Sequence, residues 1–253
     1  DEQYTYIDAA KNKGYNVLLM DGQLDVPMIN MLEQKFEKSH FTRVDSDVID
    51  RLIVKEEQKG EELADTKREI LATVFNGQLP KVQKTEFHVE TQAMGETSAP
   101  IIITQAEYMR RMKEMANIQP GMSFYGEMPD MFNLVLNVDH KLVKQVLNDA
   151  DNSCKAALEP IEAEMTSLNK RHDELHKAQE GKKADEIPQA EKDELSDVEK
   201  KLADEKTKKE AVLGEYAGGN KVIRQLIDLA LLQNNMLKGE ALTNFVKRSI
   251  ELI

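Results

Sequence analysis

The chain has 253 residues, 32% of them charged, and a net charge of −12, so it can hold one or two domains with cores of their own. The negative charge opposes binding to nucleic acid and to anionic lipid, because both carry negative phosphates. A single cysteine, Cys154, excludes an intramolecular disulfide and fits a reducing, cytosolic compartment. No stretch reaches the roughly 18 consecutive apolar residues of a membrane span. The first residue is Asp1 rather than methionine, so we expect a segment of a longer protein.

The first fifty residues alternate between helix and strand patterns. The patterns predict helices at 4–13 and 25–36 and strands at 15–20 and 40–45. Gly14 fits the position that closes a helix. This alternation is typical of a parallel α/β arrangement, so we predict a small α/β subdomain over residues 1–52.

The residues that follow, up to the charged segment, predict an α+β unit. Helix patterns cover 54–75, 105–117 and 140–147, and strand patterns cover 81–89, 100–104 and 131–138. We expect the strands to gather into one small sheet within a second domain, residues 53–253.

Charge rises sharply between Lys155 and Glu210, where half of the residues are Asp, Glu, Lys or Arg. Leu158, Ile161, Met165, Leu168, His172 and Leu175 alternate steps of three and four, the spacing of a coiled-coil seam, and Leu195, Val198, Leu202 and Val212 continue a weaker seam. Gly181 and Pro188 bracket a turn. We therefore predict an inserted antiparallel helical hairpin over 151–217, the arm.

Two apolar helices end the sequence, one at 222–232 and one at 241–253. Each apolar stripe is wider than one neighbouring helix can cover. The pair either packs on its own domain or meets a second copy across a two-fold axis as a four-helix bundle. The second alternative places these residues in a dimer interface: Ile223, Leu226, Ile227, Ala230, Phe245, Val246 and Ile250. It also predicts that Leu226→Asp splits the dimer.

A methionine stripe marks the helix predicted at 105–117. Tyr108, Met109, Met112 and Met115 share one side of it. Phe124 and Tyr125 follow in a loop whose glycines and prolines argue against regular structure. Methionine is flexible and polarisable, so the stripe either packs on the sheet or binds varied apolar partners.

Motifs for catalysis are weak. His172 and His176 have the spacing of a metalloprotease helix, but Asp173 stands where the general-base glutamate belongs, and no third ligand is evident. No glycine loop matches a nucleotide-binding pattern. Cys154 has no legible activating partner, so a buried or idle thiol is expected. We expect no catalytic, cofactor or metal site in this segment.

Four stretches resemble the heat-shock protein 90 chaperone family, in the same order along the chain. Residues 15–25 resemble its "GxEVLLL…IDE" strand and helix start, and residues 99–104 resemble "TPAIVST". Residues 134–140 resemble "LEINPDH", and residues 226–232 resemble the "LLxxxALL" dimerisation helix. The chain is thereby similar to the end of the middle domain plus the C-terminal dimerisation domain of bacterial HtpG-type members.

This resemblance implies a homodimeric, ATP-dependent, cytoplasmic stress-response chaperone of bacteria, whose ATP and Mg²⁺ bind in an N-terminal domain that is absent here. It implies protein folding as the process and unfolded proteins as clients, with Tyr108, Met109, Met112, Met115, Phe124 and Tyr125 as candidate client contacts. The sequence departs from the family in the long arm, and we expect no acidic tail of the kind that recruits tetratricopeptide co-chaperones.

Two other functions stay open from the sequence. In the first, the chain is a structural adaptor whose charged arm docks a specific protein. In the second, it is a remnant metalloenzyme that uses His172 and His176, for which we expect no bound metal.

Overall fold

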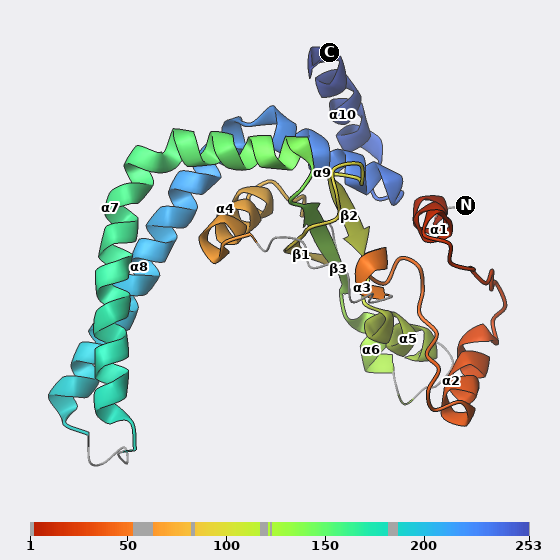
Figure 1. The fold of residues 1–253 in the computed structure, drawn as a ribbon, viewed down its shortest axis with the longest axis horizontal. Coiled ribbons are helices and arrows are strands. Elements are labelled where there is room, and N and C mark those ends of the chain that lie inside the picture. Colours follow the sequence, from red (N-terminus) through yellow and green to blue (C-terminus); the bar gives the residue numbers. More distant parts are fainter. Residues whose placement is uncertain are drawn as a thin grey trace.

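A computed structural model of the chain describes residues 3–52, 63–81, 84–116, 121, 123–181 and 187–252, except for the side chains of Asp50, Ser123, Tyr125 and Leu252. Helices dominate and flank a small sheet, so the fold is α+β as predicted (Figure 1). The elements are α1 (Tyr4–Asn12), α2 (Asp25–Lys35), α3 (Ile49–Leu52), α4 (Asp65–Asn76), β1 (Thr85–Gln92), β2 (Ile101–Thr104), α5 (Glu107–Ala116), α6 (Ser123–Glu127), β3 (Asp130–Asn137), α7 (Lys141–Gln179), α8 (Gln189–Gly219), α9 (Lys221–Gln233) and α10 (Gly239–Leu252).

The sheet is mixed, and its order is β1-β3-β2 within the described part of the chain. β1 runs parallel to β3, with Val89 opposite Leu134, and β2 runs antiparallel to β3, with Ile103 opposite Leu134. The three strands predicted for this unit are confirmed. β1 begins later than predicted because Lys84 has a φ of 55°, which lies outside the extended region.

The main core lies between this sheet and helices α4, α7, α8 and α9. Each element contributes side chains that are almost fully buried: Leu71, Val74, Phe75, Val89, Ile101, Leu134, Leu136, Val143, Leu213, Ile223 and Ile227. Helix α4 ends at Asn76, one residue beyond its predicted limit, with Gly77 as its C-cap. The first part of its predicted range falls on residues 53–62, which lie outside the described residues.

Helices α1 and α2 confirm the helix predictions for residues 1–52. Gly14 has a φ of 79°. Its N–H donates to the Lys11 carbonyl, and the Tyr15 N–H donates to the Ala10 carbonyl. These two bonds satisfy the end of α1 with a left-handed glycine, so Gly14 closes the helix as predicted.

The two strands predicted for residues 1–52 are wrong. Residues 15–20 and 40–45 form no strand, and Leu18 and Leu19 are 70% and 84% exposed. A strand needs a hydrogen-bonded neighbour, and no described strand pairs with either segment. Within the described residues, this part of the chain therefore consists of helices joined by segments that form no strand.

The arm is an antiparallel pair, α7 and α8, as predicted, and its base is continuous with the main core. α7 runs unbroken from the core into the arm, and it contains Pro160, which removes one helical hydrogen bond and accounts for the bend of α7 seen in Figure 1. Cys154, Leu158 and Leu213 belong to the main core. The outer part, residues 166–181 and 187–205, is called the distal arm, and it has its own small cluster of Leu168, Leu175 and Val198.

A buried lysine fastens the base of the arm. The Lys209 side chain is 5% exposed, and its Nζ lies 3.0 Å from a Glu69 oxygen on α4 and 3.3 Å from a Glu162 oxygen on α7. Burial opposes the charged ammonium, but the hydrogen bonds to the two glutamates outweigh it and raise the pKa of Lys209. Lys209 of α8 thus links this helix to α4 and α7.

Candidate functional site

Helix α5 is the clearest candidate for a functional site because its two faces have opposite character. Glu107, Arg110, Arg111 and Glu114 share one face, and the methionine face (Tyr108, Met109, Met112 and Met115) lies on the other. The helix follows β2 directly, so the sheet fixes where it starts. What holds the charged face therefore determines where the methionine face points.

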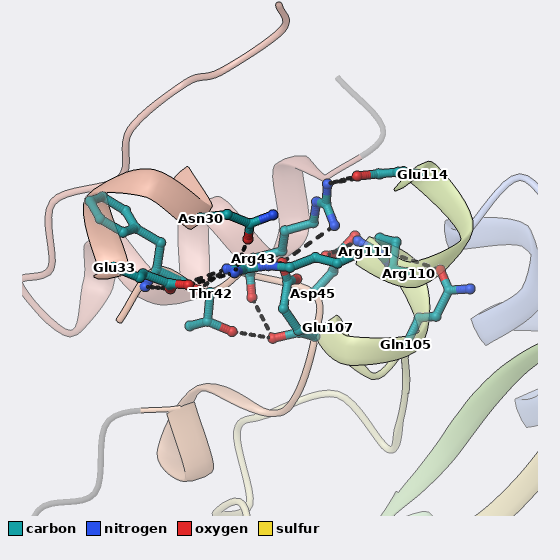
Figure 2. Close-up of polar contacts among 12 residues, drawn as sticks. Asn30, Glu33, Thr42, Arg43, Asp45, Gln105, Glu107, Arg110, Arg111 and Glu114 are labelled. Atoms are coloured by element: carbon teal, nitrogen blue, oxygen red, sulfur yellow. Dashed lines mark hydrogen bonds and ion pairs between the residues drawn. The ribbon is translucent and has the colours of Figure 1, made fainter. Parts of the chain in front are cut away.

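Arg111 is the centre of the charged face. Its Nη1 lies 2.7 Å from a Glu33 oxygen on α2, and its Nε lies 2.7 Å from a Glu107 oxygen one turn earlier on α5. It also donates to the Asn30 side chain and the Phe41 carbonyl. Figure 2 shows these groups converging from α2, the 40–45 segment and α5. A planar guanidinium with several partners fixes the orientation as well as the contact.

Two further arginines complete the same contact. Arg43 donates two bonds of 2.8 Å to the Glu114 carboxylate, and Arg110 Nη1 lies 2.7 Å from an Asp45 oxygen (Figure 2). Arg110 also donates to Gln105. The charged side chains of α5 thereby form ion pairs with side chains of residues 25–45.

The electrostatics agree with this geometry. The hydrogen bond from Arg111 is the main reason that the pKa of Glu33 lies below its ordinary value, and the Phe41 N–H contributes as well. Its bond to Glu33, with help from Glu107, raises the pKa of Arg111. Both groups stay charged at neutral pH, so the contact is a fixed feature of the fold.

Within the described part of the chain, the methionine face makes no comparable ion pairs. Tyr108 is 67% exposed, and the three methionines are half-buried. Helix α6 packs beside α5 and carries Phe124, which is 71% exposed. The sequence predicted an irregular loop here, but Ser123–Glu127 forms a short helix. The side chain of Tyr125, the last predicted client contact, lies outside the described residues.

A cleft that the sequence did not predict lies on the other side of α5. It has a volume of about 1240 Å³ and is lined by residues 15–26, residues 40–44 and the charged side chains Glu107, Arg111 and Glu114. The same apolar residues that predicted a buried strand form its wall, which includes Leu18 and Leu19. Because their apolar pattern predicted a strand, the sequence analysis did not predict a cleft here.

The predicted dimer residues fall into two groups. Four residues of α9 are 0–4% exposed within a single chain, where they pack in the main core: Ile223, Leu226, Ile227 and Ala230. Phe245 of α10 is partly buried against that core. Val246 and Ile250 of α10 are 48% and 70% exposed. The sequence analysis did not place Leu229 of α9 in the interface. This residue is 38% exposed, unlike the buried residues of the same helix.

Polar contacts set the direction of α10. The Asp228 carboxylate on α9 is 1% exposed and lies 2.5 Å from Nη2 of Arg248 on α10. Gln225 donates to the Ser249 hydroxyl, and Lys221 pairs with Glu251. These contacts hold one side of α10 against α9, and Figure 1 shows the helix projecting beyond the body of the molecule.

Cys154 is buried. Burial, with Asp151 and Glu215 nearby, raises the pKa of its thiol, which opposes the reactive thiolate. The predicted buried thiol is confirmed. None of the described helices is long and apolar enough to cross a bilayer.

Comparison with known proteins identifies close relatives. The chain is 68% identical to the chaperone protein HtpG of Bacteroides fragilis and 68% identical to that of Bacteroides thetaiotaomicron, over its whole length. It is 45% identical to the HtpG of Porphyromonas gingivalis over 99% of its length. It spans 37% of the length of each of these relatives. No protein-family model and no solved structure matches it.

Proposed function

The chain belongs to the HtpG chaperones of the heat-shock protein 90 family and corresponds to a C-terminal portion of them, and from this we propose that it holds non-native proteins on the methionine face of α5 and joins two copies through α10. The observation that carries the client site is the division of α5. Its charged face makes ion pairs with residues 25–45, whereas on its methionine face Tyr108 is 67% exposed and the three methionines are half-buried.

The chemistry of the methionine face suits a variable partner. An unfolded protein exposes apolar side chains of many shapes, and an unbranched thioether adapts to such shapes better than a branched side chain does. Tyr108 and Phe124 add exposed rings at the edge of the face, and aromatic side chains contribute much contact area for little conformational entropy.

The test is the suppression of aggregation of heat-unfolded citrate synthase by the 253-residue chain. Replacing Met109, Met112 and Met115 by serine should weaken suppression several-fold and leave the oligomeric mass unchanged. A matched control replaces Met28 and Met31 of α2, which are 40% and 59% exposed, by serine. Equal suppression by the triple variant and the wild type refutes the site, and so does equal loss in the control.

We place the dimer contact on the exposed side of α10. Val246 and Ile250 lie one helical turn apart on α10, and Leu229 is a further partly exposed apolar residue on α9. The four α9 residues named from the sequence already pack within their own chain, so they would support the interface rather than form it. In a two-fold dimer, the α10 helices of both chains would cover each other's apolar side.

For the whole protein we propose an ATP-dependent homodimeric chaperone of the bacterial cytoplasm. ATP and Mg²⁺ would bind in a part of the protein outside this chain, and this chain would supply client contacts and dimerisation. The charge of −12 opposes nucleic acid as a partner. ATP turnover by the full-length protein, together with its absence from this chain alone, would test that division.

The arm supports a second candidate function, that of an adaptor for a specific protein. It projects from the body (Figure 1), and half of the residues between Lys155 and Glu210 are charged. Because its base belongs to the core, the informative deletion is the distal arm, residues 166–205, replaced by a short Gly-Ser turn. The chaperone function predicts that dimerisation and client holding survive this deletion, whereas an adaptor would lose its partner.

A further inference from the structure

Two histidines and a glutamate meet on the distal arm. His172 and His176 lie one turn apart on α7, with ring centroids 4.5 Å apart. Glu199 lies on α8, and its Oε1 is 3.8 Å from Nε2 of His172. The sequence showed no third ligand beside the histidine pair because Glu199 lies on the returning helix. The antiparallel pairing of α7 and α8 supplies it.

The distances suit a metal ion. One ligand atom from each of the three residues lies within 4.8 Å of the other two. Bonds of about 2.0–2.2 Å from a tetrahedral ion to nitrogen or oxygen place its ligands about 3.3–3.5 Å apart. The three side chains therefore need to close by about 1.5 Å at most, which rotation about their own bonds can provide without movement of the helices.

The surroundings hold the two helices in register. Leu168, Leu175 and Val198 form the apolar cluster of the distal arm. Arg171 on α7 lies 2.7 Å from a Glu194 oxygen on α8. Contacts from both helices thus keep the histidine pair opposite Glu199 before any ion binds.

Exposure and charge also favour a cation here. His172 is half-buried, and His176 and Glu199 are exposed, so water can reach the remaining coordination positions. The Asp173 carboxylate lies 4.0 Å from Nδ1 of His172. This distance is too long for a hydrogen bond, but the negative charges of Asp173 and Glu199 beside the two imidazoles favour a cation.

We propose that His172, His176 and Glu199 bind one divalent transition-metal ion, with Zn²⁺ as the probe, and that this ion clamps α7 to α8. Two imidazoles and one carboxylate favour Zn²⁺, Ni²⁺ or Cu²⁺ over Mg²⁺ and Ca²⁺, which prefer oxygen ligands. The ion has a structural role, since it links two helices of the arm. The opposing explanation is that His172 and Glu199 form only an occasional ion pair.

The experiment is calorimetric titration of the metal-free 253-residue chain with Zn²⁺, with Mg²⁺ as the negative ion control. We expect one Zn²⁺ per chain. His172→Ala, His176→Ala and Glu199→Gln should each weaken binding at least about tenfold, because loss of even an outer-shell partner typically costs about 10- to 100-fold. Far-UV circular dichroism should show unchanged helix content, since two of the three side chains are exposed and none is fully buried.

Two variants serve as matched controls. His88→Ala removes an exposed histidine of β1, far along the chain from the arm, and Asp197→Asn removes a carboxylate of α8 that faces Lys200. Both should bind Zn²⁺ as the wild type does. Absence of Zn²⁺ binding overturns the proposal. Binding that needs the histidines but is unaffected by Glu199→Gln also overturns it, because the ion would then not join the two helices.

Discussion

The substitution Leu226→Asp tests whether Leu226 belongs to the core of its own chain or to a dimer interface. From the sequence, this substitution should split a dimer, but the structure buries Leu226 in its own chain, where it is 4% exposed. Losing the leucine costs about 1.5–3 kcal/mol of apolar burial. Placing an unpaired carboxylate there costs at least about 3 kcal/mol more, whether it stays charged or binds a proton. The sum, about 5 kcal/mol or more, rivals the whole stability of a small domain.

Ile250→Asp is the matched comparison, because Ile250 is 70% exposed on α10. In one chain it should change the free energy of unfolding by less than about 1 kcal/mol, whereas in a dimer it places a charge in the apolar contact. Light scattering gives the mass, and circular dichroism during urea unfolding gives the stability at a fixed chain concentration. We expect Leu226→Asp to unfold at much lower urea and Ile250→Asp to remain folded as a monomer. A stable monomeric Leu226→Asp chain, or a dimeric Ile250→Asp chain, would refute the assignment.

Three further predictions concern stability. Because the folded pKa of Glu33 lies below its ordinary value of 4.5, its bond to Arg111 should stabilise the fold fully above that value and lose its effect as acid protonates the folded carboxylate; Glu33→Gln should flatten this part of an acid unfolding curve. Burial raises the pKa of Tyr6 to about 12, so its contribution should be complete below pH 10 and vanish toward pH 12, and the difference in stability from Tyr6→Phe should shrink over that window. Lys209→Met should stay within about 1 kcal/mol of the wild type in urea unfolding, whereas Lys209→Glu, which puts a third carboxylate beside two others, should destabilise by about 3 kcal/mol or more.

Local patterns predicted most of the helices and the sheet because the main signals are periodic. The strands β2 and β3 and the helices α9 and α10 lie within a few residues of their predicted limits. The strand prediction for residues 15–20 was wrong because an apolar run does not by itself specify a secondary structure. Whether the run becomes a strand depends on a neighbouring strand, and the described part of the chain pairs none with it.

The site was predictable in composition but not in its connections. The spacing of Met109 and Met112 placed them on one face of a helix. The bond between Arg111 and Glu33 joins residues far apart in the sequence, and no local pattern reveals such a pair. The same limit concealed Glu199 as a partner of the histidines, because only the pairing of α7 with α8 brings it there.

Crosslinking from the methionine face tests the proposed client site most directly. A photoreactive benzoylphenylalanine would replace Tyr108 in one variant and Tyr4 in another, since both tyrosines are 67% exposed and only Tyr108 lies on that face. We predict that light couples unfolded citrate synthase to the chain at position 108 and much less at position 4. Equal coupling at both positions, or none at position 108, would contradict the proposal that this face holds non-native proteins.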